Sequence, residues 1–87
     1  MKLVVVSQNG CNPCTMVKNF LTNEQEVEFE VFNLSTEKFI EIEGEEITKD
    51  DLSIMSTPVT ILFDGDEEIG RVIGFVPSDL EVLAEQM

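Results

Sequence analysis

Two hydrophobic patterns mark the first third of the chain. Lys2–Ser7 contains a continuous run of aliphatic side chains, most of them β-branched, which is typical of a strand buried on both faces. A turn over Gln8–Gly10 separates this strand from a helix that begins within Cys11–Cys14. Val27–Phe32 then alternates between apolar and charged positions, which predicts a second strand. The order strand, helix, strand indicates a right-handed parallel crossover.

The segment 35–48 has no clear period. A helix over Thr36–Ile42 and a short hairpin turning at Glu43-Gly44 both fit it, and we favour the helix. Thr48–Asp51 then has the form of a capping box, with an acid three residues after a threonine. This motif predicts a short helix that runs through Met55.

Strand and turn signals are clearest in the second half of the chain. Val59–Phe63 is a predicted strand after Pro58, Asp64-Gly65 is a strong hairpin signal, and Glu67–Ile73 returns as the antiparallel partner. Ser78–Glu81 forms a second capping box, which predicts the start of a final amphipathic helix. The fold class is therefore α/β, with a four-stranded mixed sheet flanked by about three helices in the order β-α-β-α-β-β-α.

Length and composition fit a single domain over residues 1–87. With 43% hydrophobic residues, a chain of 87 residues can build one core without a metal or several disulfides. The apolar run near the start is too short for a signal-peptide core, and no later run approaches a membrane span. We therefore expect a cytoplasmic protein with no membrane partner, and in that reducing compartment a disulfide is more often catalytic than structural.

Charge is distributed unevenly along the chain. The formal net charge is -13, from 18 carboxylates against 5 cations, and no acidic residue precedes Glu24. A solvated surface explains this composition, and a sharper interpretation is that carboxylates are kept away from a segment in which a thiolate must form. Either interpretation disfavours binding to nucleic-acid phosphates or to anionic lipid.

The candidate chemistry is confined to two cysteines, because the chain has no histidine. This excludes histidine acid–base catalysis and argues against a self-contained zinc site. Cys11 and Cys14 lie where a strand passes into a helix, with Asn12 as the expected N-cap and Pro13 in the first turn. Unpaired N–H groups and the positive dipole end of the helix stabilise a thiolate there. The sequence thus predicts that an exposed Cys11 attacks a substrate disulfide and that Cys14, on the buried helix face, resolves the mixed disulfide.

Other interpretations of the pair stay open. A structural disulfide would close only a short loop, which stabilises a chain little. Half of a metal or cluster site that bridges a dimer would need two further ligands from elsewhere. An acidic interaction protein without enzymatic activity, which imitates nucleic acid in a basic groove, would leave Cys11 and Cys14 unexplained. A disulfide reductase is the favoured interpretation.

Three features resemble the thioredoxin-fold redoxins, the thioredoxins and glutaredoxins, and together they cover nearly the whole chain. They are Cys11-Asn12-Pro13-Cys14 after the first strand, Ser56-Thr57-Pro58 before a later strand, and the hairpin that continues through Gly70–Gly74 into the last helix. The resemblance implies a thioredoxin-like fold, thiol-disulfide oxidoreductase activity and a cis peptide bond at Pro58. The residues that it places at a substrate-binding surface are Asn12, Pro13, Thr57, Pro58 and Gly74.

Several residues differ from the family pattern, and these differences limit which subfamily the chain resembles. Gly10 and Val5 stand where thioredoxins usually have a tryptophan and a buried aspartate, and Gln8 stands where glutaredoxins have a lysine that serves glutathione. The stretch Gly74–Asp79 is closer to small redoxins that pass electrons to ribonucleotide reductase. The resemblance therefore implies a disulfide-containing protein substrate and a reductant of the thioredoxin reductase type rather than glutathione. It also implies a monomer with no cofactor beyond the redox-active disulfide between its two cysteines.

Overall fold

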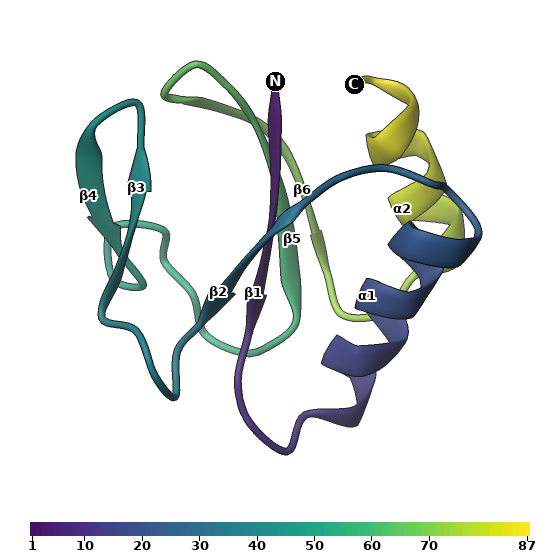
Figure 1. Cartoon of the computed structure of the whole chain (residues 1–87), viewed down its shortest axis with the longest axis horizontal. Coiled ribbons are helices and arrows are strands. Elements are labelled where there is room, and N and C mark those ends of the chain that lie inside the picture. Colours follow the sequence, from purple (N-terminus) through teal and green to yellow (C-terminus); the bar gives the residue numbers. More distant parts are fainter.

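The computed structural model describes residues 1–87, the whole chain (Figure 1). Six strands and two helices form, and neither helix is long and apolar enough to cross a membrane. In chain order the elements are β1 (Lys2–Ser7), α1 (Asn12–Asn23), β2 (Glu30–Asn33), β3 (Phe39–Ile42), β4 (Glu45–Thr48), β5 (Val59–Asp64), β6 (Glu67–Ile73) and α2 (Pro77–Glu85).

Four of the strands form a mixed sheet in the order β2-β1-β5-β6. β1 pairs with β2 in parallel, which confirms the expected crossover through α1. β5 lies antiparallel to β1, and β6 lies antiparallel to β5 after a turn at Gly65, whose φ of 63° suits glycine. The predicted four-stranded mixed sheet is thus confirmed.

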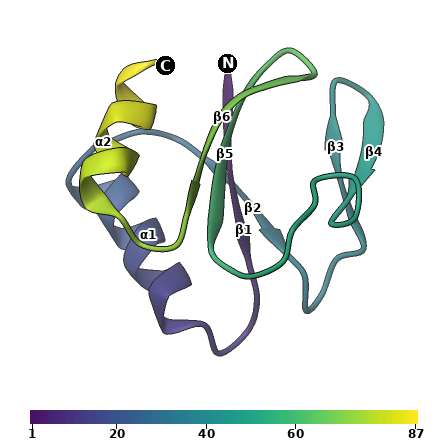
Figure 2. The ribbon, with the colours of Figure 1, turned by 180° about the vertical axis from the view of Figure 1, so that it is seen from behind.

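Layers cover both faces of this sheet. Helices α1 and α2 lie on one face and the small β3–β4 hairpin lies on the other, as two opposite views show (Figure 1 and Figure 2). Because β1 is a central strand and both faces of the sheet are covered, Leu3–Val6 are all buried, as predicted. The helix-side core consists of Leu3, Val5, Val17, Leu21, Leu62, Val72, Leu80 and Leu83. The hairpin-side core consists of Val4, Val6, Phe32, Ile40, Ile42, Leu52, Val59, Ile61 and Phe63.

The segment after β2 folds as a hairpin, so the helix expected over Thr36–Ile42 is wrong and the helices number two. β3 and β4 pair antiparallel around Glu43-Gly44, where φ is 51° and 81°. Ile40 and Ile42 are two residues apart, which places them on one face of a strand but far apart around a helix. Both pack in the hairpin-side core. Burial of this pair against the sheet is therefore the physical reason for a strand.

The helix expected over Thr48–Met55 is also wrong, although its capping box forms. The N–H of Thr48 donates to the Asp51 carboxylate at 2.9 Å, and the N–H of Asp51 donates to the Thr48 hydroxyl at 3.2 Å. Ser53 then takes a left-handed conformation with φ of 56°. A residue in this conformation ends a right-handed turn, so the first turn does not extend into a helix.

The final helix begins earlier than the capping box at Ser78–Glu81 predicts. α2 starts at Pro77, and its N-cap, Val76, makes no side-chain hydrogen bond. Proline suits the first turn because its missing N–H would have no partner within the helix. The expected cap at Ser78 is therefore wrong by two residues, whereas the helix itself is confirmed.

Candidate active site at the start of helix α1

Cys11 and Cys14 form a disulfide bond where β1 passes into α1. Their Cα atoms are 5.2 Å apart. Cys11 is partly exposed, whereas Cys14 is 1% exposed and shares the buried side of α1 with Val17 and Leu21. An incoming sulfur can therefore approach Cys11 from solvent, whereas Cys14 is accessible only from within the molecule.

The N-cap of α1 is Cys11. The sequence predicted Asn12 at this position, so that prediction is wrong by one residue. The Sγ of Cys11 accepts a hydrogen bond from the N–H of Cys14 at 3.2 Å, so sulfur replaces the side-chain oxygen of a usual cap. Asn12 and Pro13 are exposed in the first turn, where the missing N–H of proline leaves no bond unmade. In the reduced state this N–H and the positive end of the helix favour a thiolate at Cys11.

The loop before β5 lies against Cys11. The Thr57–Pro58 peptide bond is cis, as the resemblance implied. The Oγ1 of Thr57 lies 3.6 Å from the Sγ of Cys11, which joins residues 46 positions apart in the chain. The carbonyl of Pro58 accepts a hydrogen bond from the N–H of Gly74 at 2.8 Å. The structure thus brings Thr57, Pro58 and Gly74 together with the disulfide-bonded Cys11 and Cys14, which are five of the predicted site residues.

Hydrogen bonds also tie the loop before Cys11 to the segment after β2, a feature that the sequence analysis missed. The side-chain amide of Asn33 donates to the side-chain oxygen of Asn9 at 3.0 Å. The N–H of Asn9 donates to the Ser35 hydroxyl at 2.9 Å. Asparagine and serine are common in turns for purely local reasons, so these residues carried no signal of a contact across 24 or 26 positions.

Exposed apolar side chains and free main-chain groups flank the site. Met55 is 94% exposed in the loop before Thr57, and Ile73 is 62% exposed just before Gly74. The main-chain N–H and C=O of Thr57 take part in no backbone hydrogen bond. A cavity of about 160 Å³ lies beside them, between this loop and the loops that follow β1 and β2. The loop therefore offers space, apolar contacts and unpaired backbone to an approaching chain.

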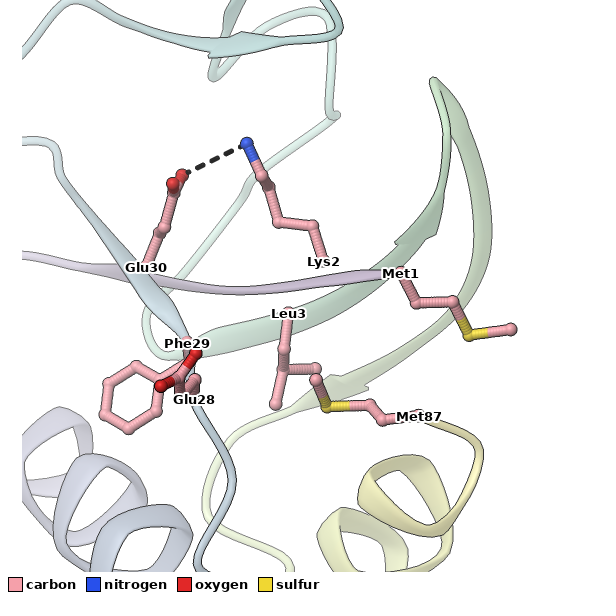
Figure 3. A pocket seen from close by; sticks show the side chains of 7 residues that line it. All are labelled: Met1, Lys2, Leu3, Glu28, Phe29, Glu30 and Met87. Carbon is pink, nitrogen blue, oxygen red and sulfur yellow. Dashed lines mark ion pairs between the residues drawn. The ribbon is translucent and has the colours of Figure 1, made fainter.

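A second cavity, of about 270 Å³, lies at the opposite end of β1 from the cysteines (Figure 3). Met1, Phe29 and Met87 contribute apolar side chains to it. Lys2 and Glu30 also line it and form an ion pair at 3.5 Å. It contains no cysteine, so it belongs to neither step of a thiol reaction.

The ionisable groups form no second catalytic cluster. No three histidine, cysteine, aspartate or glutamate side chains are grouped so that they could hold a metal ion. The one clear pKa shift is at Arg71 of β6, where hydrogen bonds to the Glu68 carboxylate raise the pKa of the guanidinium. An arginine is already fully charged at neutral pH, so this shift has no catalytic consequence.

Solved structures share this fold at low sequence identity. Thioredoxin f2 of Chlamydomonas reinhardtii superimposes with a TM-score of 0.66 over 97% of this chain and 75% of its own, at 18% identity. Fasciola hepatica thioredoxin gives a TM-score of 0.65 over 98% and 80% of the two chains, at 19% identity. A thioredoxin-fold protein from Helicobacter pylori gives 0.64 over 97% and 68%, at 22% identity. These similarities confirm the thioredoxin fold.

The fold and the Cys11–Cys14 pair define a thiol-disulfide oxidoreductase. No family model matches the chain. The SPbeta prophage-derived thioredoxin-like protein YosR of Bacillus subtilis (strain 168) is 33% identical over 88 residues, which cover 100% of this chain and 99% of that protein. Because a relative at this identity matches over the full length, the chain belongs to the thioredoxin-like proteins.

Proposed function

We propose that this protein reduces disulfide bonds in protein substrates, with Cys11 as the attacking thiolate and Cys14 as the resolving one. The observation that carries the proposal is the unequal placement of the two sulfurs. Cys11 is partly exposed and caps a helix, whereas Cys14 is buried. Exposure and an N–H donor suit a nucleophile, and burial beside Cys11 suits a sulfur that reacts only within the molecule.

The reaction consists of two thiol-disulfide exchanges. The Cys11 thiolate attacks one sulfur of the substrate, a bond forms between them, and the other substrate sulfur leaves as a thiolate. Cys14 then gives its proton to solvent and attacks the Sγ of Cys11. This second exchange forms the Cys11–Cys14 disulfide and releases the remaining substrate thiolate. Two electrons have passed to the substrate, and a separate dithiol reductant restores the pair.

We place the substrate chain against the loop Ser56–Pro58, beside Asn12 and Pro13. The unpaired N–H and C=O of Thr57 suit an extended segment next to the substrate cysteine, as in the addition of a strand. Exposed apolar side chains on the same loop and at the end of β6 supply adaptable contacts. Recognition of this kind depends on backbone and apolar surface, which suits a range of sequences around the disulfide.

Charge and the family resemblance support the choice of redox partners. Gln8 offers no positive charge to the carboxylates of glutathione, which supports a reductant of the thioredoxin reductase type. We extend the proposal to ribonucleotide reductase as an electron acceptor, and to a cytoplasmic monomer that uses no cofactor besides its disulfide.

A net charge of -13 favours a partner with a basic docking face. Exchanging Glu41 and Glu46 for lysine should therefore slow reduction by a specific reductase, and an unchanged rate at low salt would argue against this docking.

Reduction of insulin disulfides with dithiothreitol as electron source tests the central proposal. Wild type should accelerate the reaction, and Cys11→Ser should abolish the acceleration. Cys14→Ser should also stop turnover and accumulate a mixed disulfide with the substrate. Thr22→Ala, at an exposed position near the other end of α1, is the control and should keep the wild-type rate.

A wild type no faster than Cys11→Ser would refute the proposal. That result would favour the acidic interaction protein, whose binding to a basic partner should be the same in wild type and Cys11→Ser. A cluster-bridged dimer would instead lose its metal in both cysteine variants. The same set of proteins therefore separates the three interpretations.

A further inference from the structure

Thr60 carries the one buried side-chain polar atom in the molecule that has no hydrogen-bond partner. The residue is 0% exposed in β5. Buried hydroxyls are normally hydrogen-bonded, and an unpaired one makes the fold less stable than a valine of the same shape would. In the oxidised protein the hydroxyl of Thr60 therefore has no hydrogen-bond partner and lowers the stability of the fold.

The alternation of β5 places Thr60 on the helix side of the sheet. Val59 and Ile61, its neighbours in the chain, belong to the hairpin-side core, so Thr60 points to the opposite face. Its cross-strand neighbours are Val5 of β1 and Val72 of β6. Both valines belong to the helix-side core, so the hydroxyl lies within an apolar layer beneath the helices.

Cys14 lies on the buried face of α1 with Val17 and Leu21, and both of these residues belong to this layer. This helix runs back along β1, so its first turn lies over the end of the strand (Figure 1). The stretch from Cys14 to Leu21 rises about 10 Å, roughly the length of the buried part of β1. Cys14 is therefore nearest to the rows of Ser7 and Val5, and Thr60 is the residue paired with Val5.

We propose that the Thr60 hydroxyl donates a hydrogen bond to the Cys14 sulfur once the disulfide is reduced, and that it stabilises the Cys14 thiolate during resolution. In the disulfide the sulfur is held by Cys11, and the hydroxyl has no partner. Reduction breaks that covalent bond and lets the sulfur turn toward the sheet. A thiolate in an apolar layer is costly without a donor, so one hydroxyl there has a large effect.

No charged side chain competes for this role. No residue that β1, β6 or α2 contributes to the buried layer is charged, since Ser7 is the one polar residue among them, and all 18 carboxylates belong to exposed residues. On α1, Lys18 lies about 100° around the axis from the buried Val17 and is partly exposed. The buried polar side chains of the whole chain are Ser7 and Thr60, and Ser7 lies nearer to the loop at the end of β1.

The role of the hydrogen bond from Thr60 to Cys14 in catalysis rests on the proposed function. During resolution Cys14 gives its proton to solvent and its thiolate attacks the Sγ of Cys11, which releases the substrate thiolate. Thr60 keeps its own proton throughout and acts only as a donor to the sulfur. It is a positioning residue, whose loss slows resolution without removing a reacting group.

Titration of Cys14 in a Cys11→Ser background isolates the bond and needs no substrate. Ultraviolet absorbance of the thiolate gives the midpoint, and the absence of tyrosine and tryptophan removes their background. Thr60→Val should raise the midpoint by about one pH unit, the effect of losing one hydrogen bond to a charged acceptor. Thr60→Ser keeps the hydroxyl and should restore it. Thr22→Val, the same change at an exposed position, should leave the midpoint unaltered.

If the midpoint of Cys14 thiolate formation is the same in Thr60→Val and Thr60→Ser, the proposal is overturned. It is also overturned if Ser7→Ala shifts this midpoint and Thr60→Val does not. Thermal unfolding of the oxidised protein supplies a second readout, because Thr60→Val removes an unpaired hydroxyl and should raise the Tm. A higher Tm with an unchanged midpoint would assign Thr60 a structural role only. Insulin reduction is measured separately, so a failure of the proposed function would be distinguishable from a failure of this bond.

Discussion

Replacing Thr57 by valine removes one hydroxyl beside Cys11 and leaves the shape of the side chain nearly unchanged. The Oγ1 of Thr57 lies 3.6 Å from the Sγ of Cys11. A second donor, the N–H of Cys14, lies 3.2 Å from the same sulfur and is unaffected by the change. The variant therefore removes one of two hydrogen bonds to the sulfur that attacks the substrate.

The structure sets the size and sign of the effect. A hydrogen bond to a charged group contributes about 1.5–3 kcal/mol. The contact to sulfur is long and Cys11 is partly exposed. This hydrogen bond therefore contributes about 1.5 kcal/mol or less, the lower end of that range. At about 1.36 kcal/mol per pH unit, the shift is about half a unit to one unit. The hydroxyl favours the thiolate, so its loss moves the midpoint for thiolate formation at Cys11 upward.

Thiolate absorbance of Cys11 in a Cys14→Ser background measures this midpoint against pH. Thr57→Ser retains the hydroxyl and is the matched control, with an expected midpoint close to that of the parent. Near neutral pH, the insulin-reduction rate of Thr57→Val with both cysteines present should fall several-fold, because less Cys11 is ionised. The rate should recover as pH rises through the new midpoint.

A midpoint that is the same in Thr57→Val and Thr57→Ser would refute the argument that the hydroxyl stabilises the thiolate. A lower midpoint in Thr57→Val would reverse its sign, because it would mean that the hydroxyl favours the neutral thiol. Either result would leave the N–H of Cys14 and the helix terminus as the features that favour ionisation.

Three further predictions concern the scaffold. Gly70→Ala should lower the free energy of unfolding by about 1–3 kcal/mol in a urea titration, because the added Cβ would lie 2.9 Å from the Cδ1 of Leu83; an unchanged midpoint would contradict this close contact. Ile42→Ala should cost about 2–5 kcal/mol in the same titration, since the side chain is 1% exposed between hairpin and sheet, and a cost below that range would mean that the hairpin contributes little. Asn33→Ala should speed amide exchange at Asn9 while global stability falls by no more than about 1.5 kcal/mol, and unaltered exchange would show that their hydrogen bond does not hold the loop.

Much of the sheet and the cysteine pair could be predicted because their signals are local. The β-branched run Lys2–Ser7 and the turn at Asp64-Gly65 each specify conformation within a few residues. The alternation over Val27–Phe32 predicted a strand that the structure only partly contains, because β2 begins at Glu30 and buries Phe32 rather than Val31. The position of Cys11-Asn12-Pro13-Cys14 between strand and helix was readable for the same reason. The cis bond at Pro58 was expected from the family resemblance and not from local chemistry, which favours trans.

Local patterns failed where burial against a distant element decided the outcome. Residues 36–42 fitted a helix or a strand, and packing of Ile40 and Ile42 against the sheet selected the strand. The capping box at Thr48–Asp51 formed its hydrogen bonds and still did not start a helix. A capping motif stabilises one turn, and continuation needs further residues that the surrounding structure allows to be helical.

The amino-acid sequence by itself determined the fold class, the strands of the sheet and the two sulfurs that carry the chemistry. Tertiary structure decided what surrounds those sulfurs. The contact of Thr57 with Cys11 spans 46 positions, and the unpaired hydroxyl of Thr60 became visible only when strand register placed it opposite Val5. Local preferences act over a few residues, whereas register and packing are properties of the folded chain, so only the assembled sheet could bring Thr57 to Cys11 and bury the hydroxyl of Thr60.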